Sequence, residues 1–173
     1  MSNKKNLIVL FLCYNVKEGE LKMEEFNTIE KVEELFKSIN AYGEDNAYFV
    51  ACQDKQKVSG MVSGMEYPYD GLLINDNEKG ITMFYLKAGA LSGLITLSKP
   101  SKMTLDRENH IFIPASDIKE IVIKNFALFN SKTKRIEINT IDGKSHKLYA
   151  NLEEKDFPYH REGFTKFLEK YSK

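Results

Sequence analysis

The sequence predicts a mainly β domain of the α+β class, an antiparallel barrel or sandwich capped by a C-terminal helix. From residue 46 onward, short apolar runs of strand length alternate with clusters of turn-forming residues, as in antiparallel sheets. The last part of the chain instead carries apolar residues at helical spacing. We therefore expect an N-terminal strand and helix extension over residues 1–45, followed by a β domain over residues 46–173.

The composition is that of a folded domain without a strong charge bias. The chain has 173 residues, of which 42% are hydrophobic, with 25 basic and 25 acidic side chains. This apolar content argues against disorder. Nucleic-acid-binding proteins draw much of their affinity from neutralising phosphates, so zero net charge argues against a nucleic-acid partner.

The first apolar run, residues 7–13, is too short to cross a membrane. We expect a buried strand here. A short core helix and a degenerate signal peptide are alternatives that hydrophobic periodicity cannot separate. The two cysteines, Cys13 and Cys52, lie in apolar runs and are expected to be reduced thiols rather than a disulfide. The expected location is the cytoplasm.

Residues 27–40 are predicted to form a helix. The apolar residues that share one face are Ile29, Val32, Leu35, Phe36 and Ile39. Asn27 is the expected N-cap, with Glu30 three places later as in a capping box. The helix is expected to end at "NAYGEDN", which is rich in residues that tolerate turns.

The expected strands follow from residue 46. They are "AYFVAC", "GLLIN", "ITMFYLK", "LITLS", "HIFIP", "IKEIVIK", "FALFN", "KRIEINT" and "SHKLYA". For the hairpin "KRIEINTIDGKSHKLYA", a three-residue loop with Gly143 in the left-handed conformation gives the best register. Ile138 then faces His146 and Ile136 faces Leu148, which leaves Arg135 opposite Tyr149 on the solvent side.

A second helix is predicted at the end of the chain. Phe164, Phe167, Leu168 and Tyr171 share one face, which should cover an open end of the sheet. Asp156 is the expected cap, with Pro158 in the first turn. A glycine inside a helix, here Gly163, is expected to weaken it by about 1 kcal/mol relative to alanine.

Three stretches, "YDGLLINDNEKGITMFYL", "IPASDIKEIVIKN" and "KRIEINTIDGKSHKLYA" with the helix that follows, resemble the bacterial pleckstrin-homology-like (PH-like) domain family. The resemblance covers about residues 46–173 and implies a PH-like barrel. It also implies that one strand ends at Pro114 and the next begins after "PASD" with Ile118, Ile121 and Ile123 in the core. Ser116 or Asp117 would then bond the local backbone.

No catalytic or metal-binding pattern emerges from the residue types. His110, His146 and His160 lack the spacing of metal ligands, and we expect no cofactor. His146 falls on the inner side of the predicted hairpin, where a rim or core histidine is the expectation. Cys52 has apolar neighbours, which is typical of an unreactive thiol. We therefore expect that the protein is not an enzyme.

The candidate binding residues are basic. They are Lys55, Lys57, Lys132, Lys134, Arg135, Lys144 and Lys147. Phosphoinositide-binding members of the resembled family carry a basic run in the first hairpin, of which Lys55 and Lys57 supply only part. The expected function is recognition of a protein or peptide partner, for example by strand addition. The alternatives are a small-ligand or anionic-lipid binding protein, and a self-associating structural protein.

Overall fold

The computed structural model describes residues 26–53, 71–88, 103–127 and 130–172. The elements, in chain order, are α1 (Ile29–Ser38), β1 (Ala47–Gln53), β2 (Gly71–Asn77), β3 (Gly80–Ala88), β4 (Met103–Pro114), the short 3-10 turn η3 (Ala115–Asp117), β5 (Ile118–Ala127), β6 (Asn130–Thr140), β7 (Ser145–Asn151) and α2 (His160–Tyr171). A mainly β domain with a C-terminal helix is thus confirmed. The apolar run at 7–13 and the expected strand "LITLS" lie outside the described residues.

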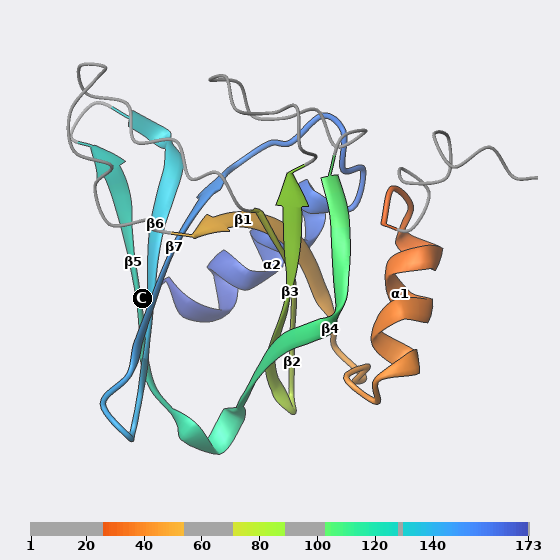
Figure 1. Ribbon diagram of the computed structural model, residues 1–173. Helices are drawn as coiled ribbons and strands as arrows, with labels where there is room; N and C mark the ends of the chain where they lie inside the picture. The colour runs from red at the N-terminus through yellow and green to blue at the C-terminus, as the bar shows by residue number, and fades with distance from the viewer. Residues whose placement is uncertain (1–25, 54–70, 89–102, 128–129, 173) are drawn as a thin grey trace, which may run out of the picture.

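The strands form one seven-stranded antiparallel sheet in the order β4-β3-β2-β1-β7-β6-β5. β1 pairs with β2 along Ala47 to Cys52, but it pairs with β7 only at Cys52 and Gln53. The two parts of the sheet therefore diverge beyond this junction, as Figure 1 shows. The sheet is open, with β4 and β5 as its edge strands.

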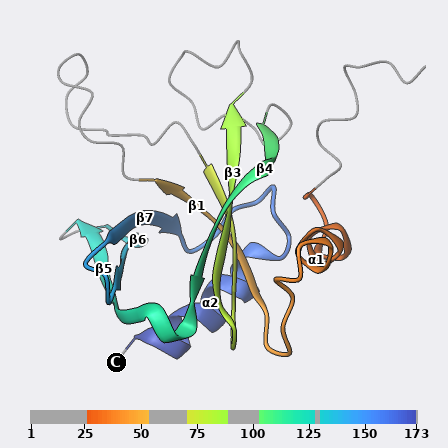
Figure 2. The ribbon, with the colours of Figure 1, turned by 60° about the horizontal axis from the view of Figure 1, so that its bottom comes forward.

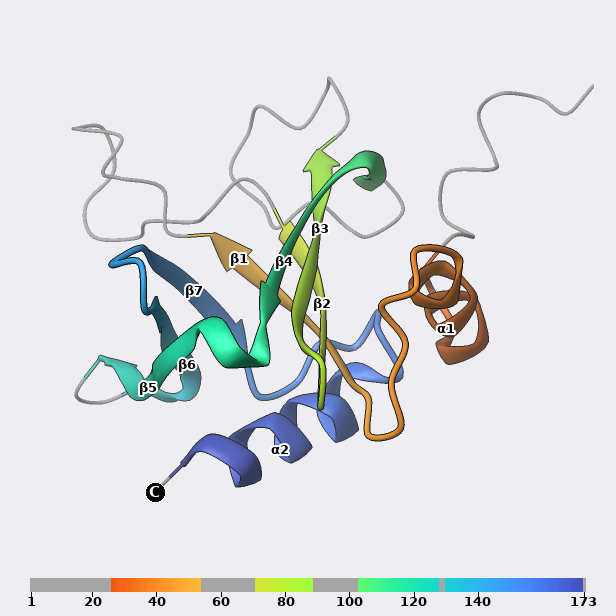
Figure 3. The same cartoon turned by 90° about the horizontal axis from the view of Figure 1, so that it is seen from below.

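α2 occupies the space between the diverging parts (Figures 1 and 3). Phe164 and Phe167 are buried there, with ring centroids 5.2 and 4.9 Å from that of Phe49. Leu168 and Tyr171 pack partly buried against the same cluster. The predicted aromatic face of the C-terminal helix is confirmed.

α2 also covers the edge of β1 that β7 leaves unpaired. The Val50 N–H donates to Nδ1 of His160 at 3.1 Å, and Nζ of Lys166 donates to the Asn46 carbonyl oxygen at 3.2 Å. Between these contacts, a Cβ atom on Gly163 would lie 2.0 Å from the Tyr48 carbonyl oxygen. α2 therefore covers the edge of β1 where a neighbouring strand would otherwise pair. Only glycine leaves enough space where α2 and β1 lie closest.

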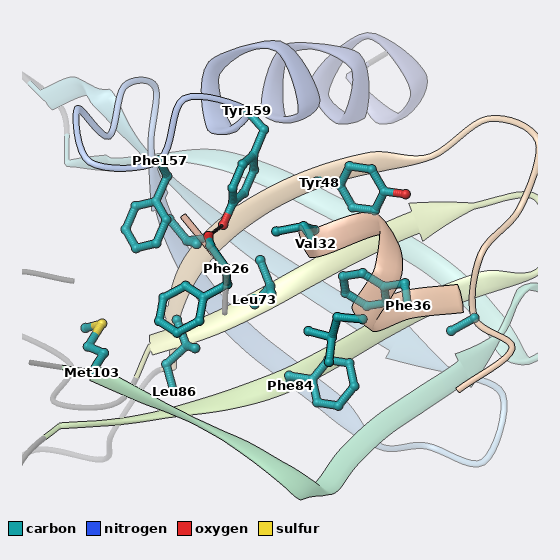
Figure 4. Packing of buried hydrophobic residues seen from close by; sticks show 13 residues of the cluster. Phe26, Val32, Phe36, Tyr48, Leu73, Phe84, Leu86, Met103, Phe157 and Tyr159 are labelled. Atoms are coloured by element: carbon teal, nitrogen blue, oxygen red, sulfur yellow. Dashed lines mark hydrogen bonds between the residues drawn. The ribbon is translucent and has the colours of Figure 1, made fainter. Parts of the chain in front are cut away.

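α1 packs on the opposite side of β1–β4. Val32, Leu35 and Phe36 are buried, and the Phe36 ring lies 5.6 Å from that of Tyr48 and 5.4 Å from that of Phe84 (Figure 4). Since both faces of the central strands are covered, all seven residues of β2 are buried. This explains why "GLLIN" is a continuous apolar run rather than an alternating one.

The ends of α1 differ in part from the prediction. The expected cap at Asn27 is wrong by one residue, because the helix begins at Ile29 and the Thr28 side chain accepts from the Lys31 N–H at 3.5 Å. Both residue types cap well, so the sequence alone does not separate them. Ile29 was expected on the apolar face, but it is 41% exposed because it lies in the first turn. The expected end is confirmed: Asn40 is left-handed with φ 59°, and the Ala41 N–H bonds the Phe36 carbonyl oxygen.

The start of α2 also differs. The helix begins at His160, after the expected positions of Asp156 and Pro158, and its N-cap residue Tyr159 makes no side-chain cap hydrogen bond. Phe157 and Tyr159 are buried in the cluster beneath α1, where the Tyr159 hydroxyl donates to the Phe26 carbonyl oxygen at 2.7 Å. Burial of these two rings directs the chain away from the helix axis, so the predicted cap is wrong.

The β6–β7 hairpin has the predicted register, with Ile138 opposite His146 and Arg135 opposite Tyr149. Gly143 has φ 84°, as the three-residue loop requires. "FALFN" is not a separate strand: Phe126 and Ala127 end β5, Asn130 begins β6, and residues 128–129 lie outside the described residues.

The "PASD" break is the turn η3, and β4 ends at Pro114 as expected. At this turn the Ser116 hydroxyl donates to the Asp117 carboxylate at 3.0 Å. The Ile141 N–H donates to the Asp117 carbonyl oxygen at 2.9 Å, which ties this turn to the β6–β7 hairpin.

Candidate functional site

The sheet surface that points away from α2 differs between its two parts. Over β1–β3 and the start of β4 it is covered by the cluster beneath α1, whereas over β5–β7 no other described element covers it (Figures 2 and 3). We call the uncovered part the β5–β7 face. Strand alternation and register place on it Glu120, Val122, Lys124, Phe126, Arg135, Glu137, Asn139, Lys147 and Tyr149, all exposed or half-buried.

An aromatic pair lies on the β5–β7 face. The rings of Phe126 and Tyr149 meet edge to face, with centroids 5.3 Å apart and planes at 88°. Phe126 is 43% exposed. Aromatic side chains of this kind, held by a neighbour yet open to solvent, are the usual anchors of protein interfaces.

Basic groups surround the pair. Arg135 lies opposite Tyr149 on β7 and opposite Lys124 on β5, and its guanidinium forms an ion pair with Glu137. Lys147 on β7 lies opposite Glu137 on β6. Counting Lys124, Arg135 and Lys147 against Glu137, this central part of the face carries a net positive charge.

Of the predicted binding residues that the structure describes, Arg135 and Lys147 lie together on this face. Lys134 points to the other side of β6, where its Nζ donates to the Asn125 side chain at 2.6 Å. Lys132 is exposed near the start of β6. Lys144 lies in the hairpin turn, paired with Asp142 at 2.6 Å. Lys55 and Lys57 lie outside the described residues.

The aromatic members of the face, Phe126 and Tyr149, were not among the predicted site residues. The signal for Tyr149 was present, because the predicted hairpin register already placed it beside Arg135 on the solvent side. The sequence pattern predicts "FALFN" as a separate strand, and this prediction gives Phe126 no partner on the face. In the structure β5 extends to Ala127, which brings Phe126 against Tyr149.

Burial favours the neutral forms of Cys52, His146 and His160. Burial raises the pKa of the Cys52 thiol to about 12, so it stays protonated and unreactive. His146 is half-buried on the inner side, as expected, and burial lowers its pKa. His160 is fully buried, and both of its ring nitrogens bond the backbone, at Val50 and Asn151.

One buried carboxylate anchors the end of α2. Asp76 on β2 is 1% exposed and accepts from Lys170 Nζ at 2.9 Å and from the Tyr171 hydroxyl at 3.1 Å. Burial raises the pKa of Asp76, and the hydrogen bond from Lys170 opposes this shift. Because every group is engaged between the helix and the sheet, the cluster has a structural role.

The described residues include neither a metal site nor a membrane-spanning helix. No group of three or more His, Cys, Asp or Glu side chains is placed to hold a metal ion there. None of the helices described is both long and apolar enough to span a membrane.

Comparison with known proteins adds no assignment. No family model, no curated protein and no solved structure matches this chain.

Proposed function

We propose that the protein is a non-enzymatic binding module of PH-like architecture that recognises a protein or peptide partner on the β5–β7 face. Support for the architecture comes from seven antiparallel strands followed by one helix, which fills the space between the diverging parts of the sheet. The single observation that carries the function is a face that no described element covers, with the exposed Phe126 ring held against Tyr149 and basic groups around it.

This arrangement suits a macromolecular partner. A partner side chain placed over Phe126 would exclude water from the aromatic pair, and acidic groups around it would meet Lys124 and Lys147. An anionic lipid surface is the second candidate, because the same basic groups would attract it. The aromatic pair favours the protein partner, since it supplies an anchor that a charged surface does not require.

The test compares two exposed phenylalanines on different surfaces. Phe126 is 43% exposed on the β5–β7 face, and Phe112 is 49% exposed on β4. Extracts are passed over the wild-type protein, Phe126→Ala and Phe112→Ala, and retained proteins are quantified by mass spectrometry. We expect Phe126→Ala to lose a specific partner by about tenfold or more, as for an interface anchor, while Phe112→Ala retains it.

The outcomes separate the candidates. Equal retention by both variants would contradict the use of the β5–β7 face. Sedimentation with vesicles that contain phosphatidylserine tests the lipid alternative. Binding that is lost on adding salt and in Lys124→Glu, yet kept in Phe126→Ala, would favour the lipid surface over the protein partner.

A further inference from the structure

The free edge of β5 carries a short segment that is complementary to itself. β5 pairs with β6 on one side, and no described strand pairs with the other. Its regular stretch lies between two register shifts, one between Ile118 and Glu120 and one between Asn125 and Ala127. Within this stretch, "EIVIK" at residues 120–124 has an acidic and a basic end with apolar residues between.

Two copies of this segment match in one antiparallel register. Residues opposite each other in antiparallel strands point to the same face. With Val122 on the two-fold axis, Glu120 of each copy lies opposite Lys124 of the other, and Ile121 lies opposite Ile123. Moving the axis to Ile123 would place Val122 opposite Lys124, and both charge pairs would be lost.

The inner side of β5 supports an added strand. Ile121 and Ile123 are only partly buried, although their partners on β6, Ile138 and Ile136, are 1% and 0% exposed. A strand alongside β5 would cover the isoleucines on their open side. Exposed apolar edge strands are the usual sites at which sheets associate.

We propose that two copies of this chain associate through their β5 edges into a symmetric dimer with one continuous sheet. The other edge, β4, is a poorer candidate, because its last regular stretch ends in Pro114 and offers no matching charges. The dimer also places both β5–β7 faces on the same side of the sheet. The dimer does not depend on partner binding at the β5–β7 face. Dimerisation and partner binding are tested by different measurements.

The test exchanges charges at the two ends of the segment. Glu120→Lys and Lys124→Glu each place like charges opposite one another twice in the dimer. We expect each variant alone to dimerise at least about tenfold more weakly than the wild type, measured by sedimentation velocity over a range of concentrations. A mixture of the two variants restores both opposite-charge pairs, so it forms the heterodimer. The double variant Glu120→Lys/Lys124→Glu dimerises like the wild type.

Lys147→Glu is the matched control. It reverses a charge on the same face, away from the β5 edge, and should leave the dissociation constant unchanged. Circular dichroism verifies that each variant is folded. A wild-type protein that stays monomeric at all concentrations would overturn the proposal. Single variants that dimerise like the wild type, or a mixture that shows no preference for the heterodimer, would overturn it as well.

Discussion

At the scale of single residues, His160 joins three parts of the fold. Its Nδ1 accepts the Val50 N–H at 3.1 Å, and its Nε2 lies 2.7 Å from the Asn151 carbonyl oxygen. These partners require a neutral ring with the proton on Nε2. A second proton on Nδ1 would point at the Val50 N–H, so burial and this contact both favour the neutral form.

The stability of the protein should therefore fall in mild acid. Burial lowers the pKa of His160 below its ordinary value of 6.5. As the pH falls through this value, the unfolded chain takes up a proton that the folded protein resists, so the free energy of unfolding decreases. The free energy of unfolding continues to decrease until the pH reaches the pKa of His160 in the folded protein. Urea unfolding at a series of pH values between 7 and 5 measures it.

His160→Gln should be less stable at neutral pH but should show a smaller loss on acidification than the wild type. Burial also lowers the pKa of His146. The variant His146→Gln therefore measures how much of the pH dependence comes from that second ring. The raised pKa of Asp76 is common to all three proteins and cancels in the comparison. An unchanged pH dependence in His160→Gln would contradict the assignment of the effect to this ring.

At the scale of elements, α2 lies unusually close to β1 at Gly163. In an ordinary helix interior, replacing glycine with alanine gains up to about 1 kcal/mol. Here the added Cβ would lie 2.0 Å from the Tyr48 carbonyl oxygen, so the helix would have to move away from the strand. We expect Gly163→Ala to lower the free energy of unfolding by about 1–3 kcal/mol.

The matched control lies two residues along the same helix. Thr165 is exposed, so Thr165→Ala should change stability only through helix propensity, with a gain of a few tenths of a kcal/mol. Urea titration of both variants measures the difference. A stabilised Gly163→Ala would show that the helix does not need its close approach to β1.

Local sequence patterns predicted the helices and strands better than the contacts between distant elements. The β6–β7 hairpin was predicted in register, because alternation and Gly143 constrain it within a few residues. The requirement for glycine at position 163 was not predicted, because it arises from a backbone atom of Tyr48, which is far away in sequence. The candidate site was foreseen only at Arg135 and Lys147, since the rest depends on how β5 pairs with β6.

At the scale of the molecule, two apolar clusters share the same strands. The cluster beneath α1 includes Tyr48 and Leu73, and the cluster around α2 includes Phe49 and Leu72. Neighbouring residues of β1 and β2 thus point into different clusters. Neither cluster can unfold without exposing one side of the strands on which the other is built, which links residues 26–45 to the rest of the fold.

We therefore expect residues 26–172 to unfold as one unit. Phe36→Leu in the first cluster and Phe167→Leu in the second should each lower the free energy of unfolding by about 1–3 kcal/mol. Each should also lower the protection of amide hydrogens throughout the sheet, because the slowest amides exchange through global unfolding.

Hydrogen exchange by mass spectrometry reports on β2 and on β6–β7 separately. If Phe36→Leu lowered protection only in α1 while β6–β7 stayed unchanged, α1 would be an appendage, as the predicted division at residue 45 implies. An equal decrease in β6–β7 would place α1 within the folding unit, because the Phe36 ring packs against Tyr48 on β1 and Phe84 on β3, and the cluster beneath α1 includes no residue of β6 or β7.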